Sequence, residues 1–383
     1  MKIRYRILSA MLAAVAVLAV PFGASAAETG EDSTGALNNY LLGYMSWGVK
    51  KMGLDVLQEK LEKSGKTLPE VRVAVLDTGI STSNKYLKGR YVDGYNFIDN
   101  NTNFEDDQYH GTEVSGVIAD GTSSNVKIIP IKVMDSKGDG KMSDTAKGIY
   151  YALDHGADVI NLSLSGDDKN HTYHSLDKAI ADALARNVVV VVAAGNQETD
   201  ASVRYPANKN NVITITAVNK QNKLALLANY GAPVDFALPG MNILAPHKNI
   251  MMPDSGTSLA APHAAAAAAL LKTWRKDLNQ AQIFEILKQY SVDLGEKGVD
   301  DTYGFGMIDL STFDINKTPE QIVPVTVGDI NKDGRVNIQD AACLQRRLAE
   351  LPAGVCDVRA ADIDRNGKVD ISDVTALQNQ LAN

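Results

Sequence analysis

The stretch Val71-Arg72-Val73-Ala74-Val75-Leu76 is almost continuously apolar and is followed directly by Asp77-Thr78-Gly79. Four more short runs have a similar β-rich, largely apolar character: residues 127–133, 158–162, 188–192 and 212–217. Strands that are buried on both faces of a parallel sheet have this composition. Helix-compatible segments lie between or after them, at residues 143–155, 175–186 and 259–274. This alternation predicts right-handed crossovers and an α/β domain with a doubly wound, mostly parallel sheet and helices on both faces.

The composition is that of a globular protein with a sizeable core. Hydrophobic residues make up 45% of the 383 residues and charged residues make up 22%. This length fits one large and one small domain. The formal net charge of -8, without a basic cluster, argues against nucleic-acid binding.

Three polar residues follow or precede predicted elements, where open α/β sheets place their sites. Asp77 follows the first strand, His110 opens His110-Gly111-Thr112, and Ser258 precedes a predicted helix in Ser255-Gly256-Thr257-Ser258. Each is a weak signal alone, because an Asp after a strand is often a helix cap and a Ser before a helix is usually an N-cap. Of the six histidines, His110 is the one that begins a Gly-flanked segment.

Taken together, and in the order Asp, His, Ser, these short motifs resemble those of the subtilisin family of serine proteases. Two more segments agree: Ala194-Gly195-Asn196 is similar to the family's oxyanion-hole segment, and residues 303–308 are similar to its closing segment. The resemblance covers about residues 47–310. It implies a secreted endopeptidase that hydrolyses peptide bonds through an acyl-enzyme and needs no cofactor for that chemistry.

The resemblance assigns catalytic roles to Asp77, His110, Ser258 and Asn196. A serine hydroxyl is a poor nucleophile until a base removes its proton, and a neutral imidazole suits that task near pH 7. Asp77 would orient His110 and stabilise the imidazolium. The Ser258 N–H, at a helix N-terminus, and the Asn196 side chain would stabilise the oxyanion.

The resemblance also indicates which segments would bind the substrate. Two segments are similar to the edges that pair with an extended peptide: Ser163, Leu164, Ser165 and Gly166, and Gly138, Asp139 and Gly140. Polar surface loops are the alternative. Arg204 precedes Tyr205-Pro206 near the expected pocket floor, so a preference for an acidic residue before the scissile bond is predicted. Alternatively, Arg204 points to solvent.

Four features depart from the family. Glu113 stands where a second His is usual, and Ser165 stands where Gly is usual, which would narrow the specificity pocket. Residues 116–133 form a shorter segment that lacks the family's main calcium loop. The extension before the domain has only about twenty residues, so the domain is expected to fold without a long propeptide.

Pro262 is expected in the first turn of the helix at 259–274, where its missing N–H costs little.

The end of the chain repeats itself at a spacing of 33 residues, from Asp329 to Asp362. Oxygen side chains recur at loop positions 1, 3, 5, 9 and 12, with Gly at 6 and a backbone carbonyl at 7. The predicted calcium ligands of the two copies are Asp329, Asn331, Asp333, Arg335, Asn337 and Asp340, and Asp362, Asp364, Asn366, Lys368, Asp370 and Asp373. A solvated acidic surface would not reproduce Gly334 and Gly367 at matching positions.

Asp at position 12 and the lack of a helix before each loop resemble a type I-like dockerin module. The resemblance covers residues 327–383 and implies a small α-helical module that binds two Ca²⁺ ions and docks onto a cohesin domain of a cellulosome-like scaffold. Cys343 and Cys356 both lie in it. They would form a disulfide in an oxidising compartment, or each would be a buried thiol.

The start of the chain has the pattern of a secretory signal peptide. Lys2, Arg4 and Arg6 precede an apolar run over residues 7–20, and Ala24-Ser25-Ala26 is a cleavage-site pattern. An uncleaved anchor is the alternative, although the apolar run is short for a bilayer span, and no later segment is predicted to span. The expected layout is signal peptide 1–26, extension 27–46, protease 47–312, linker 313–326 and dockerin 327–383.

This layout predicts a secreted, extracellular protein, free or attached to a cell surface through its scaffold, that acts on protein or peptide substrates. A narrowly specific processing protease for components of the complex would differ only in substrate. A catalytically silent, calcium-dependent assembly component is the alternative from another class. Because a decayed enzyme tends to lose a catalytic residue, the presence of all four favours the active protease.

Overall fold

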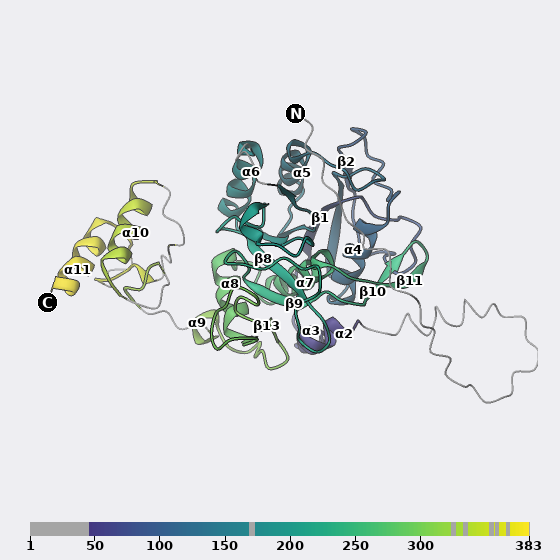
Figure 1. Ribbon diagram of the computed structural model, residues 1–383. Helices are drawn as coiled ribbons and strands as arrows, with labels where there is room; N and C mark the ends of the chain where they lie inside the picture. The colour runs from purple at the N-terminus through teal and green to yellow at the C-terminus, as the bar shows by residue number, and fades with distance from the viewer. Residues whose placement is uncertain are drawn as a thin grey trace, which may run out of the picture. The chain divides into compact units, whose positions relative to one another are not determined.

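The computed structural model describes residues 46–167, 173–322, 327–331, 336–351, 356, 360–364 and 368–382. The predicted signal peptide and most of the extension after it lie outside these ranges. The chain divides into two compact units (Figure 1). The first unit runs to Leu278 and includes Ser291–Phe313; the second comprises Asn279–Tyr290 and the chain from Asp314. Within the described ranges, no helix combines the length and apolar character that a bilayer crossing needs.

The first unit is built on a seven-stranded sheet with the order β2-β3-β1-β4-β6-β8-β9 and parallel pairing throughout. Its strands are β1 (Val71–Asp77), β2 (Tyr95–Asn96), β3 (Val126–Lys132), β4 (Val159–Leu162), β6 (Val189–Ala193), β8 (Ile213–Val218) and β9 (Phe236–Pro239). The parallel α/β prediction is confirmed, and each of the five predicted strands lies within one residue of an observed one. The sequence did not predict β2 and β9.

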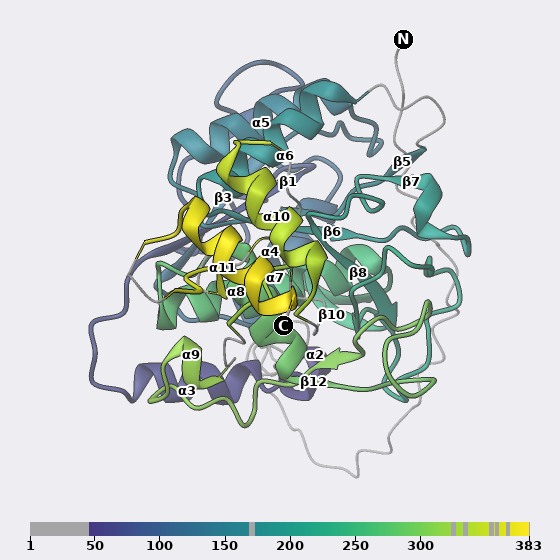
Figure 2. The same ribbon diagram turned by 90° about the vertical axis from the view of Figure 1, so that its left-hand side faces the viewer.

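Helices cover both faces of this sheet. On one face, α5 (Met142–Asp154) and α6 (His174–Ala185) lie side by side (Figure 1, Figure 2). They pack on alternate residues of the strands, among them Leu76, Ile131 and Val190. On the other side, α4 (His110–Asp120) and α7 (Thr257–Trp274) contact β1, and α7 also contacts β4, β6 and β8. The short helices α2 (Trp47–Lys51) and α3 (Leu54–Glu62) precede the sheet.

Helix α7 is buried along almost its whole length, as its alanine-rich sequence allows. The prediction that Pro262 lies in the first turn is wrong, because the helix begins at Thr257 and Pro262 is its sixth residue. An N–H at position 262 would have bonded the carbonyl of Ser258. The hydroxyl of Ser163 donates to that carbonyl instead, at 2.9 Å. A side chain from another segment therefore supplies the hydrogen-bond donor that proline lacks.

An antiparallel hairpin, β10 (Ile243–His247) and β11 (Ile250–Asp254), leads into α7. It packs against α4: a Cβ atom on Gly116 would lie 2.0 Å from Cδ of Pro246. Glycine at position 116 therefore lets strand and helix approach closely. Two further strand pairs complete the unit: β5 (Gly166–Asp167) with β7 (Arg204–Tyr205), and β12 (Ser291–Val292) with β13 (Met307–Ile308). A short 3₁₀ helix, Ala201–Val203, precedes β7.

The second unit is helical, as the sequence predicts for the end of the chain. It contains α8 (Gln280–Gln289), α9 (Pro319–Ile322), α10 (Ile338–Leu348) and α11 (Ile371–Ala382). Helices α10 and α11 each follow one copy of the repeated loop and share a small core of Ile330, Ala341, Cys343, Leu344, Ala360, Ala361, Val374 and Leu377. Cys343 is joined to Cys356 in a disulfide, so of the two alternatives for these cysteines the structure has the bond.

We expect Gly116→Val to destabilise the first unit by about 1–3 kcal/mol, because the added side chain has to displace Pro246 from α4. The chain's two tryptophans, Trp47 and Trp274, both lie in the first unit, so their fluorescence during denaturant unfolding reports on it. Lys66→Ala, at an exposed position, is the control. A change below about 0.5 kcal/mol for Gly116→Val would contradict the close packing of β10 on α4.

Candidate active site and metal-binding loops

Asp77 and His110 meet at the carboxyl end of strand β1. Asp77 is the last residue of β1, His110 is the first of α4, and both side chains are buried. His110 Nδ1 lies 2.8 Å from Oδ1 of Asp77, and the same oxygen accepts the N–H of Thr78 at 2.7 Å. A carboxylate in this position fixes the ring and favours the tautomer with the proton on Nδ1.

The other ring nitrogen of His110 is left available. Among the residues that the structure describes, Nε2 is buried and has no hydrogen-bond partner. Ser258 lies in the first turn of α7, and only 8% of it is exposed. No hydrogen bond joins Nε2 to the Ser258 hydroxyl. Such bonds are often long in a ligand-free site and tighten when substrate binds.

The charge around His110 favours its protonated form. Burial of the ring disfavours the imidazolium, but the carboxylate of Asp77 outweighs it, and the pKa of His110 is raised to about 9. Glu113 and Asp254 act in the same direction from farther away. The site therefore stabilises a positive charge on this ring.

Asn196 is held with its amide nitrogen toward Ser258. Its Oδ1 accepts two hydrogen bonds from Thr257, from the backbone N–H at 2.9 Å and from the hydroxyl at 3.1 Å. A Cβ atom on Gly256 would lie 3.1 Å from the Ser258 hydroxyl and 3.2 Å from Asn196 Nδ2. The hydroxyl and the amide donor thus border the same small space, which glycine leaves open.

The predicted substrate segments take different conformations. Gly166 pairs with Tyr205 in the β5–β7 ladder, Ser163 and Leu164 are buried, and the Ser165 hydroxyl lies near Gly195. Gly138, Asp139 and Gly140 belong to a turn in which the N–H of Asp135 bonds the carbonyl of Asp139 at 2.9 Å. The first segment lies beside the oxyanion segment, where the Ser165 hydroxyl would be 3.3 Å from a Cβ atom on Gly195.

Arg204 does not point freely into solvent. Its guanidinium donates to Asp167, its partner across the β5–β7 pair, and only 16% of its side chain is exposed. Because Asp167 already balances this charge, a substrate carboxylate would have to compete with it. The preference for an acidic residue before the scissile bond stays a prediction.

Several supporting residues were missed at the sequence level. Asp106 accepts hydrogen bonds from the backbone of Gln108, Tyr109 and Thr112, so it holds the turn that begins α4. The buried ammonium of Lys132 donates to the carbonyl of Thr78, next to Asp77, at 2.7 Å. No local pattern distinguishes these residues, because their partners are set by the fold. Thr257 belongs to the motif around Ser258, but the motif alone does not indicate its hydrogen bonds to Asn196.

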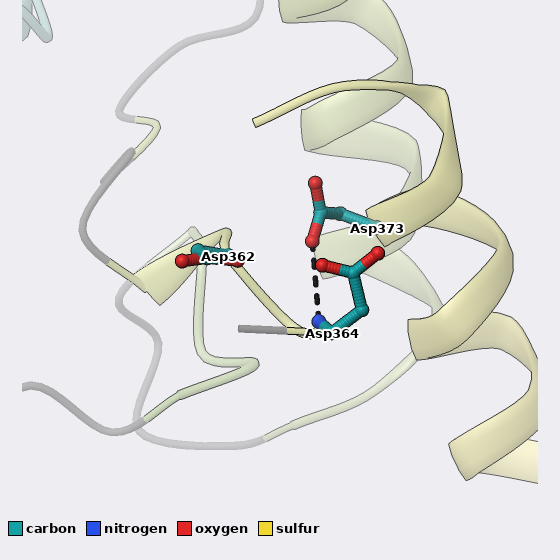
Figure 3. Close-up of side chains that lie close together, drawn as sticks. All are labelled: Asp362, Asp364 and Asp373. Carbon is teal, nitrogen blue, oxygen red and sulfur yellow. Dashed lines mark hydrogen bonds between the residues drawn. The ribbon is translucent and has the colours of Figure 1, made fainter. Parts of the chain in front are cut away.

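In the second loop of the repeat, Asp362, Asp364 and Asp373 offer carboxylate oxygens that all lie within 4.8 Å of one another (Figure 3). Two oxygens bound to one Ca²⁺ at about 2.3–2.6 Å are at most about 5 Å apart, so this donor set fits that ion. Asp370 follows in the turn before α11, where its N–H bonds Asp373 at 2.9 Å. Lys368 is described, and Asn366 lies outside the described residues.

The two loops are closed in the same way. Asp340 Oδ1 accepts the N–H groups of Ile330 and Asn331 at 2.7 and 2.9 Å, and its Oδ2 accepts that of Asn337 at 2.8 Å. Asp373 makes the three corresponding bonds, to Ile363, Asp364 and Asp370. The aspartate at position 12 therefore organises the loop backbone. Asp329 is described, whereas Asp333 and Arg335 lie outside the described residues.

Comparison with known proteins settles the family. A model described as the subtilase family matches residues 69–306. The chain belongs to the subtilase family. A second model, the type I dockerin domain, matches residues 327–382 and identifies the repeated module.

Among relatives of this subtilase, the cell wall-associated protease of Bacillus subtilis (strain 168) is 35% identical over 292 residues, which cover 71% of this chain and 31% of the relative. Subtilisin Savinase of Lederbergia lenta is 32% identical over 272 residues, 68% of this chain and 96% of the relative. A solved cold-adapted subtilisin-like serine proteinase has 28% identity and a TM-score of 0.58, covering 63% of this chain and 89% of its own. This subtilase thus spans less than a third of one relative and nearly all of another.

We expect the pKa of His110, measured by NMR titration of the full chain, to lie well above 6.5. Removing the carboxylate in Asp77→Asn should lower it, because burial then disfavours the imidazolium and only the smaller effects of Glu113 and Asp254 oppose it. His263→Ala identifies one other buried ring and controls the assignment. A His110 that titrates at or below 6.5 in the unchanged protein would contradict the electrostatics of the site.

Proposed function

We propose that this subtilase is an active serine endopeptidase whose catalytic residues are Asp77, His110, Ser258 and Asn196. The hydrogen bond between Asp77 and His110, at the carboxyl end of β1, is the observation that carries the proposal. Membership of the subtilase family, and the placement of Ser258 at the N-terminus of α7, support it.

In this mechanism His110 must be neutral at the start. Its Nε2 accepts the proton of the Ser258 hydroxyl as the oxygen attacks the peptide carbonyl. The imidazolium is stabilised by Asp77, and the negative oxygen accepts hydrogen bonds from the Ser258 N–H and from Nδ2 of Asn196. His110 then gives its proton to the leaving amine, which breaks the C–N bond and leaves an acyl-enzyme. Water hydrolyses the ester with the same proton transfers in reverse order.

The bond between Thr257 and Asn196 supports the oxyanion role. Because Oδ1 of Asn196 is occupied by two donors from Thr257, the amide cannot rotate to present its oxygen to the reaction without losing both. Donors held in place before reaction stabilise developing charge without reorganisation. Segments 163–166 and 138–140 would bind the extended substrate on either side, through main-chain hydrogen bonds.

We expect Ser258→Ala, His110→Ala and Asp77→Ala each to lower kcat by about 10⁴-fold or more, a magnitude known from the subtilisin family itself. Because the three residues act as a unit, double variants should lose little more than single ones. Cleavage of a diverse peptide library, read by mass spectrometry, provides the measurement. Hydrolysis that survives Ser258→Ala would contradict the proposed nucleophile. An unchanged protein that cleaves nothing would instead favour the catalytically silent assembly component.

We further propose that the dockerin binds two Ca²⁺ ions, one in each loop, and docks this protease onto a cohesin. Asp329, Asn331, Asp333, Asn337 and Asp340, with the Arg335 carbonyl, would hold one ion; Asp362, Asp364, Asn366, Asp370 and Asp373, with the Lys368 carbonyl, would hold the other. The ions would cross-link loops that have only a small apolar core beside them. Ile338 and Ile371, at matching positions of the repeat, are 63% and 65% exposed and offer apolar contacts to a partner.

The proposed location is extracellular. The dockerin and relatives such as a minor extracellular protease of Bacillus subtilis support it. The layout remains as the sequence suggests: signal peptide 1–26, extension 27–46, protease 47–312, linker 313–326 and dockerin 327–383. Export through the signal peptide would also place Cys343 and Cys356 where disulfides persist.

We expect a calcium chelator to unfold the dockerin and abolish cohesin binding while proteolysis continues, because folding of such small loops depends on the ion. Both tryptophans lie in the first unit, so their fluorescence should stay constant while the helical circular dichroism decreases. Binding is measured on a panel of cohesin domains, with added magnesium as the control ion. If chelation stops proteolysis and leaves the dockerin folded, the ion belongs to the other unit.

A further inference from the structure

Strand β10 lies along helix α4 with a definite register (Figure 1). Pro246 faces Gly116. His247 faces Glu113, one turn closer to the start of the helix. Lys248 lies over Tyr109, which directly precedes the helix, with Nζ 4.6 Å from the ring centre. Successive residues at the end of β10 and in the turn after it therefore contact α4 progressively closer to its start.

The central contact of this register is a short hydrogen bond. His247 Nδ1 lies 2.6 Å from Oε1 of Glu113, whose side chain is 7% exposed. The His247 ring also packs on Tyr109, with ring centres 4.6 Å apart. On the far side, the Asn84 side chain donates to the carbonyl of Lys248. Glu113 is the residue that stands where the family usually has a second histidine.

This bond joins α4, which carries His110, to the hairpin that leads into α7, the helix that carries Ser258. Glu113 is one turn after His110 on α4. His247 is on the hairpin whose second strand, β11, ends at Asp254, just before Ser258. The position of the hairpin on α4 therefore contributes to the distance between the base and the nucleophile, together with the direct contact between α4 and α7. His110 Nε2 has no partner among the described residues, so this distance still has to close during catalysis.

We propose that Glu113 and His247 form a clasp that holds the β10–β11 hairpin on α4 and so sets the distance over which Ser258 transfers its proton to His110. Both are positioning residues, since they act through the elements they join. The inference deepens the proposed serine-protease function and depends on it.

The charges around the clasp predict that it also affects the pH dependence of the reaction. Burial, with Asp254 nearby, raises the pKa of Glu113 to about 8. Burial and Lys248 lower the pKa of His247, against the opposite effect of Asp254 and Asp106. Near neutral pH the pair therefore holds a proton on the carboxyl group. When Glu113 loses it, a negative charge appears one turn from His110 and favours the imidazolium there.

The test measures kcat and KM on a peptide that the unchanged protein cleaves, together with the rate at which a fluorophosphonate labels Ser258. Glu113→Ala and His247→Ala should each lower kcat and the labelling rate by about tenfold with KM little changed, the effect of one lost hydrogen bond on alignment. Glu113→Gln and His247→Asn keep a hydrogen-bonding partner and should recover most of the rate. The double Ala variant should be no slower than the slower single variant, since both remove the same contact.

Met252→Ala, on the exposed strand of the same hairpin, is the matched control and should leave kcat unchanged. Glu113→Gln should also shift the acid limb of kcat/KM to lower pH, because a neutral amide no longer supports the imidazolium of His110; a purely structural role would not move that limb. Glu113→Asp, which keeps the charge and shortens the arm, replaces the Ala variant if the latter fails to fold, and is expected to be slower than Gln.

Additive losses in the double variant, or full activity in both Ala variants, would overturn the clasp. A change confined to KM would also overturn it, since it would place the hairpin in substrate binding instead. If the unchanged protein neither cleaves peptides nor is labelled at Ser258, the proposed function itself fails, and the positioning role with it.

Discussion

A parallel sheet has to be covered on both faces, and the organisation of the first unit follows from this constraint. Strand residues such as Val73 and Leu76 are fully buried on opposite sides, so helices must lie over each face. Crossovers of one hand then bring the carboxyl ends of the strands to one edge. Asp77 ends β1 at that edge, and the segment ending in Asn196 follows β6 there. The geometry of the active site is thus a consequence of how apolar side chains are removed from water.

The sequence was informative where a signal is local. Continuous β-branched runs predicted five strands to within one residue, and the short motifs around Asp77, His110 and Ser258 indicated the family. The predicted start of α7 at residue 259 is two residues too late, and this misplaced Pro262 within its helix. A helix start at Thr257 depends on Asn196 accepting the Thr257 N–H, a contact across more than sixty positions. No property of residues 255–262 alone contains that information.

The Glu113–His247 bond could not be predicted from the sequence for the same reason. In the sequence Glu113 is only a departure from a family pattern, and His247 is not among the candidate site residues. Their meeting depends on the register of a hairpin against a helix, and that register depends in turn on Gly116 admitting Pro246. In the dockerin, by contrast, each loop supplies its own contacts within a dozen residues, which is why the repeat could be interpreted from its sequence.

The hydrogen bond from Ser163 to α7 couples the amino acids that positions 163 and 262 can accept. Proline at 262 leaves the Ser258 carbonyl without a helical donor, and the Ser163 hydroxyl supplies one. With an alanine at 262, that carbonyl would have a donor within the helix and would no longer need the Ser163 hydroxyl. With proline there, loss of the hydroxyl leaves a buried acceptor unsatisfied. The two positions are therefore epistatic, and the tolerance of either one to substitution is set by the residue that already occupies the other.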